Sequence, residues 1–247
     1  MEPESWSALL ALAPITFLGA VLYGLTGFGS ALITVPLASH FFPLQFVIAT
    51  YSVVDLTGAL RIGLQNPRYV ERGEVVRIVP LILVGVVLGT TALVNLPRAT
   101  AMLALGLFIL AYALYTLFLR LSSRRVSRRW AYLAGITGGI TGTLFGAGGP
   151  PYAIYLSHRP LTKEQYRATL SMTSVFSIGL RMLAFLVTGL LFDPKVWLAA
   201  LIAIPAVLLG IAAASRVFHR ISRDTLMRVV ALTLLAIGVS LVMRSIR

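Results

Sequence analysis

The sequence predicts an all-α polytopic membrane protein with two repeated halves of about four helical segments each. Of its 247 residues, 58% are hydrophobic and only 12% are charged, a far smaller charged share than soluble domains carry. The apolar residues gather in segments of roughly 20, the length that crosses the hydrocarbon core of a bilayer. Eight such segments cover 7–39, 44–65, 75–95, 99–120, 131–157, 165–190, 195–217 and 224–244.

The first and fifth segments differ from the others because glycine and proline interrupt them. GFGS (27–30) interrupts the first segment and GAGGPP (146–151) interrupts the fifth. Both residue types disfavour a helix interior, so each segment is expected to break there and to continue as a half-length helix.

Matching positions indicate an internal duplication. At an offset of 119, eight identities fall in the 34 columns from 19 to 52, and at an offset of 125, nine fall in the 32 columns from 80 to 111. The first repeat is expected over 1–120 and the second over 131–247, with a basic cytoplasmic linker at 121–130.

Charge distribution predicts the topology of the chain. If all eight segments cross the membrane, the loops on the two sides carry 8 and 11 basic residues. If the two broken segments enter and return on the same side, with the acidic N-terminus outside, 15 basic residues lie inside and 4 outside. This bias fits the positive-inside rule and predicts three crossings plus one re-entrant hairpin per half, with the halves inverted. Long kinked spans are the alternative.

Each break is expected to help bind an anion. A half-helix that begins inside the membrane presents backbone N–H groups and the positive end of its dipole, and these are tolerated only beside protein or a wet cavity. Two such helix starts facing each other predict an anion site, whereas close packing through small residues is the structural alternative. The expected site residues are Gly27, Phe28, Gly29 and Ser30 in the first break and Gly146, Ala147, Gly148 and Gly149 in the second.

Repeat-equivalent hydroxyls are expected to flank this site. They belong to Thr50, Ser52, Thr169 and Ser171. The alternative is back-bonding of each hydroxyl to a carbonyl of its own helix.

Charged residues inside the apolar segments are the remaining candidates. Arg181 lies deep in the sixth segment, where a charge is costly, and it is expected to face the anion; pairing with helix C-termini or snorkelling is the alternative. Asp55 is the only acidic residue in the interior of a predicted span, since Asp224 stands at the first position of its span. It is assigned either a coupling role, with a proton or another cation, or an ion pair with Arg61 or Arg181. Arg61 is equally well placed to snorkel to the interface.

Several function classes lack support. The chain has no cysteine, no HExxH, no GxSxG and no phosphate-binding GxxxxGK[ST] motif, so we predict no enzyme activity, no metal site and no cofactor. The net charge of +13 is attributed to basic loops rather than to nucleic-acid binding. The expected partners are a small anion, the lipid bilayer, and protons or another coupling ion, and the sequence sets no oligomeric state.

Three stretches resemble the sulfite exporter TauE/SafE family, also called the toluene-sulfonate uptake permease family. They are GLTGFGSALITVPLA (24–38), GGITGTLFGAGGPPYAIYL (138–156) and YRATLSMTS (166–174). The first departs from the family's GxGGG form at Ser30 and Ala31. The resemblance covers nearly the whole chain and implies a multi-pass inner-membrane transporter for sulfite, sulfoacetate or related organosulfonates, commonly working outward, with the glycines of both breaks at the anion site.

The resulting expectation is a secondary transporter that exports a small sulfur-containing anion by alternating access, as one half rocks against the other. An anion channel, an importer of the same substrate class and a membrane scaffold without a substrate are the alternatives.

Overall fold

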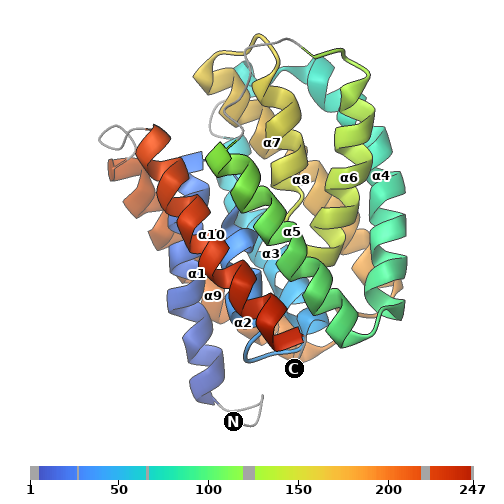
Figure 1. Ribbon diagram of the computed structural model, residues 1–247, viewed down its shortest axis with the longest axis vertical. Coiled ribbons are helices and arrows are strands. Elements are labelled where there is room, and N and C mark those ends of the chain that lie inside the picture. Colours follow the sequence, from blue (N-terminus) through green and yellow to red (C-terminus); the bar gives the residue numbers. More distant parts are fainter. Residues whose placement is uncertain (1–5, 27, 65–66, 119–125, 218–222, 246–247) are drawn as a thin grey trace.

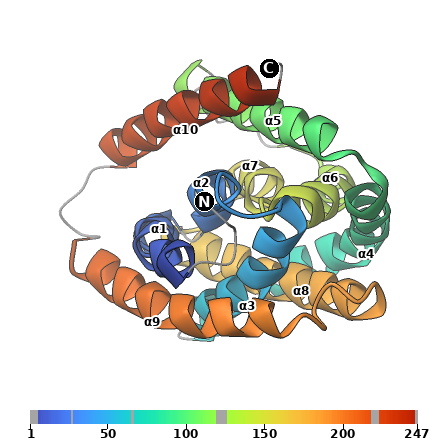
Figure 2. The same cartoon turned by 90° about the horizontal axis from the view of Figure 1, so that it is seen from below.

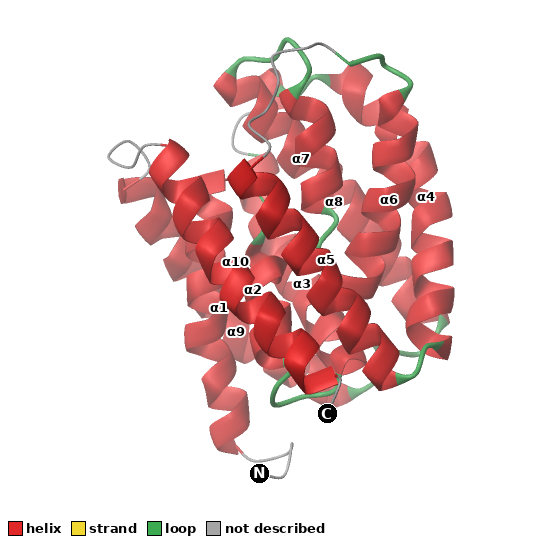
Figure 3. Cartoon of the chain, viewed as in Figure 1, coloured by secondary structure: helices red, strands yellow, loops and turns green. Residues whose placement is uncertain are grey.

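The computed structural model describes residues 6–26, 28–64, 67–118, 126–217 and 223–245 and contains no strand in these ranges. Helices follow one another along this part of the chain, joined by short loops (Figure 3). They are α1 (Trp6–Thr26), α2 (Ser30–Ala38), α3 (Leu44–Gly63), the 3-10 helix η1 (Pro67–Tyr69), α4 (Arg72–Asn95), α5 (Arg98–Phe118), α6 (Trp130–Phe145), α7 (Gly149–Ser157), α8 (Lys163–Val187), α9 (Pro194–Val217) and α10 (Arg223–Ser245). The all-α prediction is confirmed.

The two segments predicted to be broken are each divided into a longer and a shorter helix. Segment 7–39 becomes α1 and α2, and segment 131–157 becomes α6 and α7. The short helices α2 and α7 have nine residues each. Nine residues rise only about 14 Å, less than half of the hydrocarbon thickness, so these two helices are half-helices.

Both broken segments fold back on themselves. A Cβ atom built on Gly29 would lie 3.6 Å from Leu22, and one built on Gly19 would meet Ser30 and Thr34. In the second half, Gly148 lies beside Gly142, and Gly138 lies against the ring of Tyr152. In each segment, residues close to the break contact each other, and residues farther from the break on one helix contact residues farther along the other helix. The two helices of each segment therefore run antiparallel, and α1–α2 and α6–α7 are two helical hairpins.

The hairpins lie in the middle of the molecule. Seen along the helices, α1, α2, α7 and α6 form a central layer between the pair α5 and α10 on one side and α9, α3, α8 and α4 on the other (Figure 2). The packing of the two halves is matched: α6 packs on α4 as α1 packs on α9, α8 packs on α4 as α3 packs on α9, and α3 packs on α8 and α5 on α10. A duplicated chain is expected to give such paired contacts. Inversion of the halves relative to a bilayer stays a prediction.

The helices run between two ends of the molecule (Figure 1). Loops 67–71, 126–129 and 158–162 lie at one end, here called the linker end, and loops 39–43, 96–97 and 188–193 lie at the opposite end (Figure 1). Five helices of the described residues are long and apolar enough to cross a membrane: α3, α4, α5, α8 and α9. Leucines remain exposed along the outer helices, for example Leu83 and Leu88 on α4 and Leu201 and Leu209 on α9. These features are those of a multi-pass membrane protein.

Candidate functional site

The tips of the two hairpins meet at the centre of the molecule. A Cβ atom built on Gly149, the first residue of α7, would stand 2.8 Å from the Cβ of Phe28, and one built on Gly146 would stand 3.0 Å from the Cβ of Ala31. The glycines therefore allow the second break to approach the start of α2 closely. Gly27 lies outside the described residues.

At the second break, α6 ends at a glycine and α7 begins with two prolines in its first turn. Gly146 ends α6 with a φ of +69°, a conformation that favours glycine, and the N–H of Ala147 donates to the Thr141 carbonyl at 3.2 Å. Pro150 and Pro151 occupy the first turn of α7 and have no N–H groups. The backbone donors that this helix start offers a ligand are therefore limited to Gly148 and Gly149.

Arg181 reaches this break from α8. It is 3% exposed, and its Nη1 donates a hydrogen bond to the carbonyl of Gly142 in the last turn of α6. Among the residues that the structure describes, its Nε and Nη2 have no hydrogen-bond partner. Arg167, also on α8, donates at 2.9 Å to the carbonyl of Gly24 in the last turn of α1. Arg181 thus does pair with a helix C-terminus, the alternative considered from the sequence, but with only one of its three nitrogens.

Two further polar side chains lie beside Arg181, and the sequence analysis did not select them. The Tyr152 hydroxyl and the Ser177 Oγ are 2.9 Å apart, and both residues are buried. A Cβ atom built on Gly142 would lie 3.3 Å from the Cα of Gly148 and 3.6 Å from the Ser177 Oγ. We call Gly142, Gly148, Tyr152, Ser177 and Arg181 the Arg181 cluster. No repeat signal marked Tyr152 or Ser177, because their first-half equivalents are residues of other types.

The first break is different because it contains a carboxylate. Gly29 precedes α2 with a φ of +90°, and the Ser30 Oγ donates to Asp55 Oδ1 at 2.8 Å. A small cavity of about 10 Å³, room for about one water molecule, lies beside this pair. Residues from α1, α2, α3 and α9 line this Asp55 cavity: Ala20, Tyr23, Ser30, Asp55, Gly58, Val207 and Ile211.

Asp55 forms neither of the ion pairs considered from the sequence. Arg61 is exposed and belongs neither to the Arg181 cluster nor to the lining of the Asp55 cavity. Arg181 lies near the Ser30–Asp55 pair, since a Cβ atom built on Gly146 would lie 3.9 Å from Arg181 Nη1 and 3.0 Å from the Cβ of Ala31, but Arg181 and Asp55 do not form an ion pair. Helical geometry explains why Arg61 does not pair with Asp55. Arg61 follows Asp55 by six residues, which is well over one helical turn, so Arg61 falls on the outer face of α3.

The four predicted hydroxyls do not gather at one place. Gly63 at the end of α3 lies against Ser171 and Met172 of α8, so the two helices are antiparallel and Ser52 lies about 16 Å along α3 from the level of Ser171. Ser52 donates to the carbonyl of Ile48 in its own helix, the back-bonding alternative. Thr169 accepts from the backbone N–H of Glu71. The expectation that all four flank one site is therefore corrected, since each pair lies in the early turns of its own helix. The buried hydroxyls of Thr50 and Ser171 have no hydrogen-bond partner within the described part of the chain.

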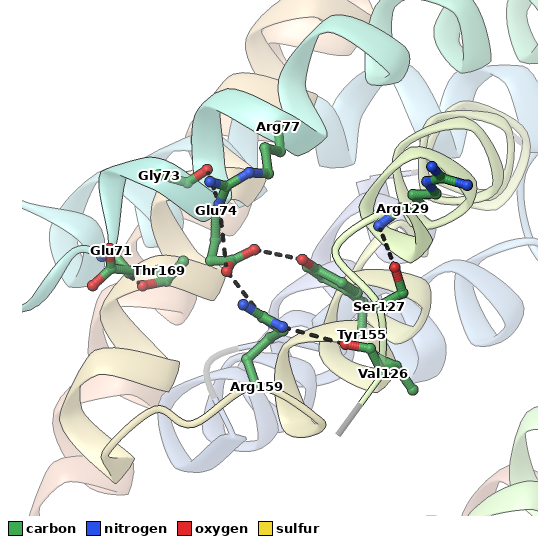
Figure 4. Close-up of polar contacts among 10 residues, drawn as sticks. All are labelled: Glu71, Gly73, Glu74, Arg77, Val126, Ser127, Arg129, Tyr155, Arg159 and Thr169. Carbon is green, nitrogen blue, oxygen red and sulfur yellow. Dashed lines mark hydrogen bonds and ion pairs between the residues drawn. The ribbon is translucent and has the colours of Figure 1, made fainter. Parts of the chain in front are cut away.

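A separate ionic network joins the halves at the linker end. Glu74 on α4 is 4% exposed and accepts hydrogen bonds from the Tyr155 hydroxyl at 2.5 Å and from Arg159 Nε at 2.9 Å (Figure 4). Arg77 lies 3.6 Å from the same carboxylate, and Arg159 also donates to the Val126 carbonyl. We call this the Glu74 network. Glu74 precedes the predicted span 75–95 by one residue, which is why the sequence analysis did not consider it as a buried acid.

Comparisons with known proteins match nearly all of this chain. The family profile described as "Sulfite exporter TauE/SafE" matches residues 12–241, a range that includes both breaks, the Arg181 cluster and the residues of the Asp55 cavity. Over 253 aligned residues the chain is 27% identical to a Cupriavidus necator protein named "Probable sulfite/organosulfonate exporter TauE". This alignment covers 100% of the chain and 98% of the relative. No solved structure matches the chain.

Proposed function

The chain belongs to the sulfite exporter TauE/SafE family, and on this premise we propose that it exports a small sulfur-containing anion by secondary transport. Sulfite, sulfoacetate and related organosulfonates are the candidate substrates, in line with the name of the C. necator relative. The anion binds where the two hairpin tips meet, at the Arg181 cluster.

Arg181 is the observation that carries this proposal. A guanidinium group is permanently charged and offers five N–H donors in a planar fork that matches an oxyanion. In Arg181 only Nη1 has a partner, and the whole residue is buried. A buried charge without a direct ion-pair partner is costly, and inside a membrane protein it normally marks a functional site.

The surroundings of Arg181 supply the other donors for a tetrahedral sulfur anion. The backbone of Gly148 and Gly149 lies at the start of α7, where the helix dipole favours a negative charge. The Tyr152 and Ser177 hydroxyls lie on the same side and are able to reorient their protons towards a ligand. Phe28, packed against Gly149, closes the site from the first break.

Burial of Arg181 also bears on the mechanism. An anion that reaches a residue of 3% exposure needs a path that this arrangement keeps closed. We propose alternating access, in which the two hairpins move relative to the outer helices. Arg72 and Arg77 lie in the first turns of α4 and Arg159 follows α7, so these basic residues belong to the linker end. We therefore assign the linker end to the cytoplasmic side of the inner membrane, with the N-terminus outside.

Anion binding to the purified protein in detergent is the first test. Thermal stability is recorded with sulfite, sulfate, thiosulfate, sulfoacetate, taurine and acetate at one ionic strength. We expect a selective rise of the unfolding temperature with one or more sulfur oxyanions and none with acetate, because binding to the folded state alone stabilises it. Equal shifts with all anions, or none with any, contradict the proposed substrate class.

Flux into proteoliposomes separates the transporter from its rivals. A carrier gives flux that saturates with anion concentration and exchanges labelled for unlabelled anion. Ohmic conductance without exchange would identify a channel, and protein-independent leak would indicate a scaffold. Flux from right-side-out vesicles compared with inverted ones distinguishes export from import.

A further inference from the structure

We propose that Asp55 is the proton-binding site of this transporter and that it takes up one proton when the anion binds at Arg181. This inference rests on the proposed function, since it assigns the coupling ion of the same site. A monovalent anion then crosses together with a proton, as an electrically neutral pair.

The first step of the argument is that the two half-helix starts are not equivalent. At the start of α2, the Ser30 hydroxyl already donates to a carboxylate of the chain, Asp55. The repeat partner of Asp55 is Ser174, which donates to the carbonyl of Leu170 in its own helix. The start of α7 therefore has no carboxylate from this position and instead lies near the buried Arg181. One break holds a carboxylate of the chain, and the equivalent position at the other break holds a serine.

The second step concerns the positive charge of Arg181, which attracts both the Asp55 carboxylate and a bound substrate anion. Asp55 lies near Arg181 without forming an ion pair with it, because Ser30, which donates to Asp55, adjoins Ala31, and a Cβ atom built on Gly146 would lie 3.0 Å from the Ala31 Cβ and 3.9 Å from Arg181 Nη1. In the empty site this carboxylate offsets the Arg181 charge from a distance. A bound anion would contact Arg181 directly and leave two negative charges near it in a medium of low dielectric constant. Like charges favour protonation of the weaker acid, and a sulfonate is a far stronger acid than Asp55.

The remaining groups around Asp55 do not remove this conflict. Tyr23 on α1 and Tyr51 on α3 are phenols, and Ser30 on α2 supplies only a hydroxyl. On α8, Arg167 lies near Tyr23 and donates to the carbonyl of Gly24, whereas Arg181 is the cation that acts on Asp55. The residues that α9 contributes to the Asp55 cavity, Val207 and Ile211, are apolar. A proton on Asp55 is the direct way to restore neutrality.

The Asp55 cavity favours a proton over a metal ion. It has room for about one water molecule, and only Tyr23, Ser30 and Asp55 supply side-chain oxygens to its lining. A hard cation needs about six oxygen ligands, more than this lining offers. No group of three or more acidic, histidine or cysteine residues that could hold a metal occurs among the residues described.

Proton uptake by the wild-type protein is the primary measurement. Purified protein in weakly buffered detergent solution is mixed with methanesulfonate, which stays ionised between pH 5 and pH 8, and a pH dye records proton uptake. We expect up to about one proton per bound anion, with an amplitude that depends on pH. Binding without proton uptake across this range overturns the proposal and leaves the proposed function intact.

Charge movement in proteoliposomes is the second measurement. We expect wild-type methanesulfonate flux to follow an imposed pH gradient and to carry no net current. Asp55→Asn fixes a neutral side chain, so its flux should lose the pH-gradient dependence and become a current that follows the membrane potential. Glu164→Gln, which makes the same change at an exposed position of α8, should behave like the wild type.

Two outcomes of the flux experiment decide against the inference in different ways. Asp55→Asn flux that still follows the pH gradient without current overturns the coupling role alone. Wild-type vesicles that move none of the sulfur anions overturn the proposed function and the coupling role with it. Should Asp55→Asn fail to fold, the wild-type proton-uptake measurement decides without it.

Discussion

Gly149 of the second break packs directly against Phe28 of the first, with only 2.8 Å between the position of a Gly149 Cβ and the Cβ of Phe28. The two residues are 121 positions apart in the chain, and each stands at the turn of a helical hairpin. Their contact joins the two repeats at the centre of the molecule. Any side chain at position 149 must separate the hairpin tips.

The first prediction follows from this contact. Gly149→Ala should lower the stability by about 1–3 kcal/mol, the usual cost of overpacking, and should weaken anion binding because the tips move apart. Gly179→Ala on α8 is the matched control. A Cβ atom there meets nothing within 4 Å, so the change should be neutral or stabilising by about 0.5–1 kcal/mol. Thermal unfolding with and without anion measures both effects, and equal behaviour of the two variants would refute the close contact.

Arg181 provides the second prediction. Arg181→Gln keeps a donor for the Gly142 carbonyl but removes the charge and the fork. Hydrogen bonds to charged groups contribute about 1.5–3 kcal/mol, so sulfite or sulfonate affinity should fall by roughly 10- to 150-fold. Arg61→Gln, on the exposed face of α3, should leave the affinity unchanged. Isothermal titration of both variants tests this, and wild-type affinity in Arg181→Gln would remove Arg181 from the site.

The third prediction concerns the Tyr152–Ser177 hydrogen bond. Tyr152→Phe leaves the Ser177 hydroxyl buried without its partner, and Ser177→Ala does the same to the Tyr152 hydroxyl, so each should cost about 1–3 kcal/mol. The double variant should cost less than the sum, because it removes both polar groups together. Tyr132→Phe, at a tyrosine that is 51% exposed, is the control for loss of a phenolic hydroxyl. Strict additivity in the thermal stabilities would show that the two hydroxyls do not interact.

The sequence predicted the fold better than it predicted the site. Segment length and hydropathy located the helices, and Gly27 to Gly29 and Gly146 to Gly149 marked the breaks, because glycine and proline act on local backbone conformation. Because the two breaks occupy equivalent positions in the two repeats, the sequence also predicted that the hairpin tips face each other. These features depend on residues close in sequence or on a copied pattern.

The parts of the site that were missed depend on helix direction and rotation. Antiparallel α3 and α8 separate Ser52 from Ser171, although both are repeat-equivalent. Tyr152 and Ser177 meet only through the packing of α7 on α8, which no sequence period encodes. The sequence marks Asp55 as unusual and predicts Ser30 as a substrate ligand, whereas in the structure the Ser30 hydroxyl donates to Asp55.

The Glu74 network is the basis of the last prediction. It ties α4, an outer helix of the first repeat, to the end of the α6–α7 hairpin in the second (Figure 4). Arg159 connects the same carboxylate to the backbone of Val126, which precedes α6. If this hairpin moves during transport, the network holds it closed at the linker end. Removing a partner from a buried, hydrogen-bonded charge destabilises the contact.

Glu74→Gln should therefore lower the unfolding temperature and open the linker end. The natural chain has no cysteine, so a single Ser157→Cys change at the end of α7 gives one labelling site without background. A water-soluble maleimide should label this site several-fold faster when Glu74→Gln is also present. Glu71→Gln, an exposed acid three residues away, is the control and should not change the labelling rate. Equal labelling rates for Ser157→Cys alone, with Glu74→Gln and with Glu71→Gln would mean that the network stabilises the fold without closing the path. If the network controls access at the linker end, its loss must change the exposure of the α6–α7 hairpin.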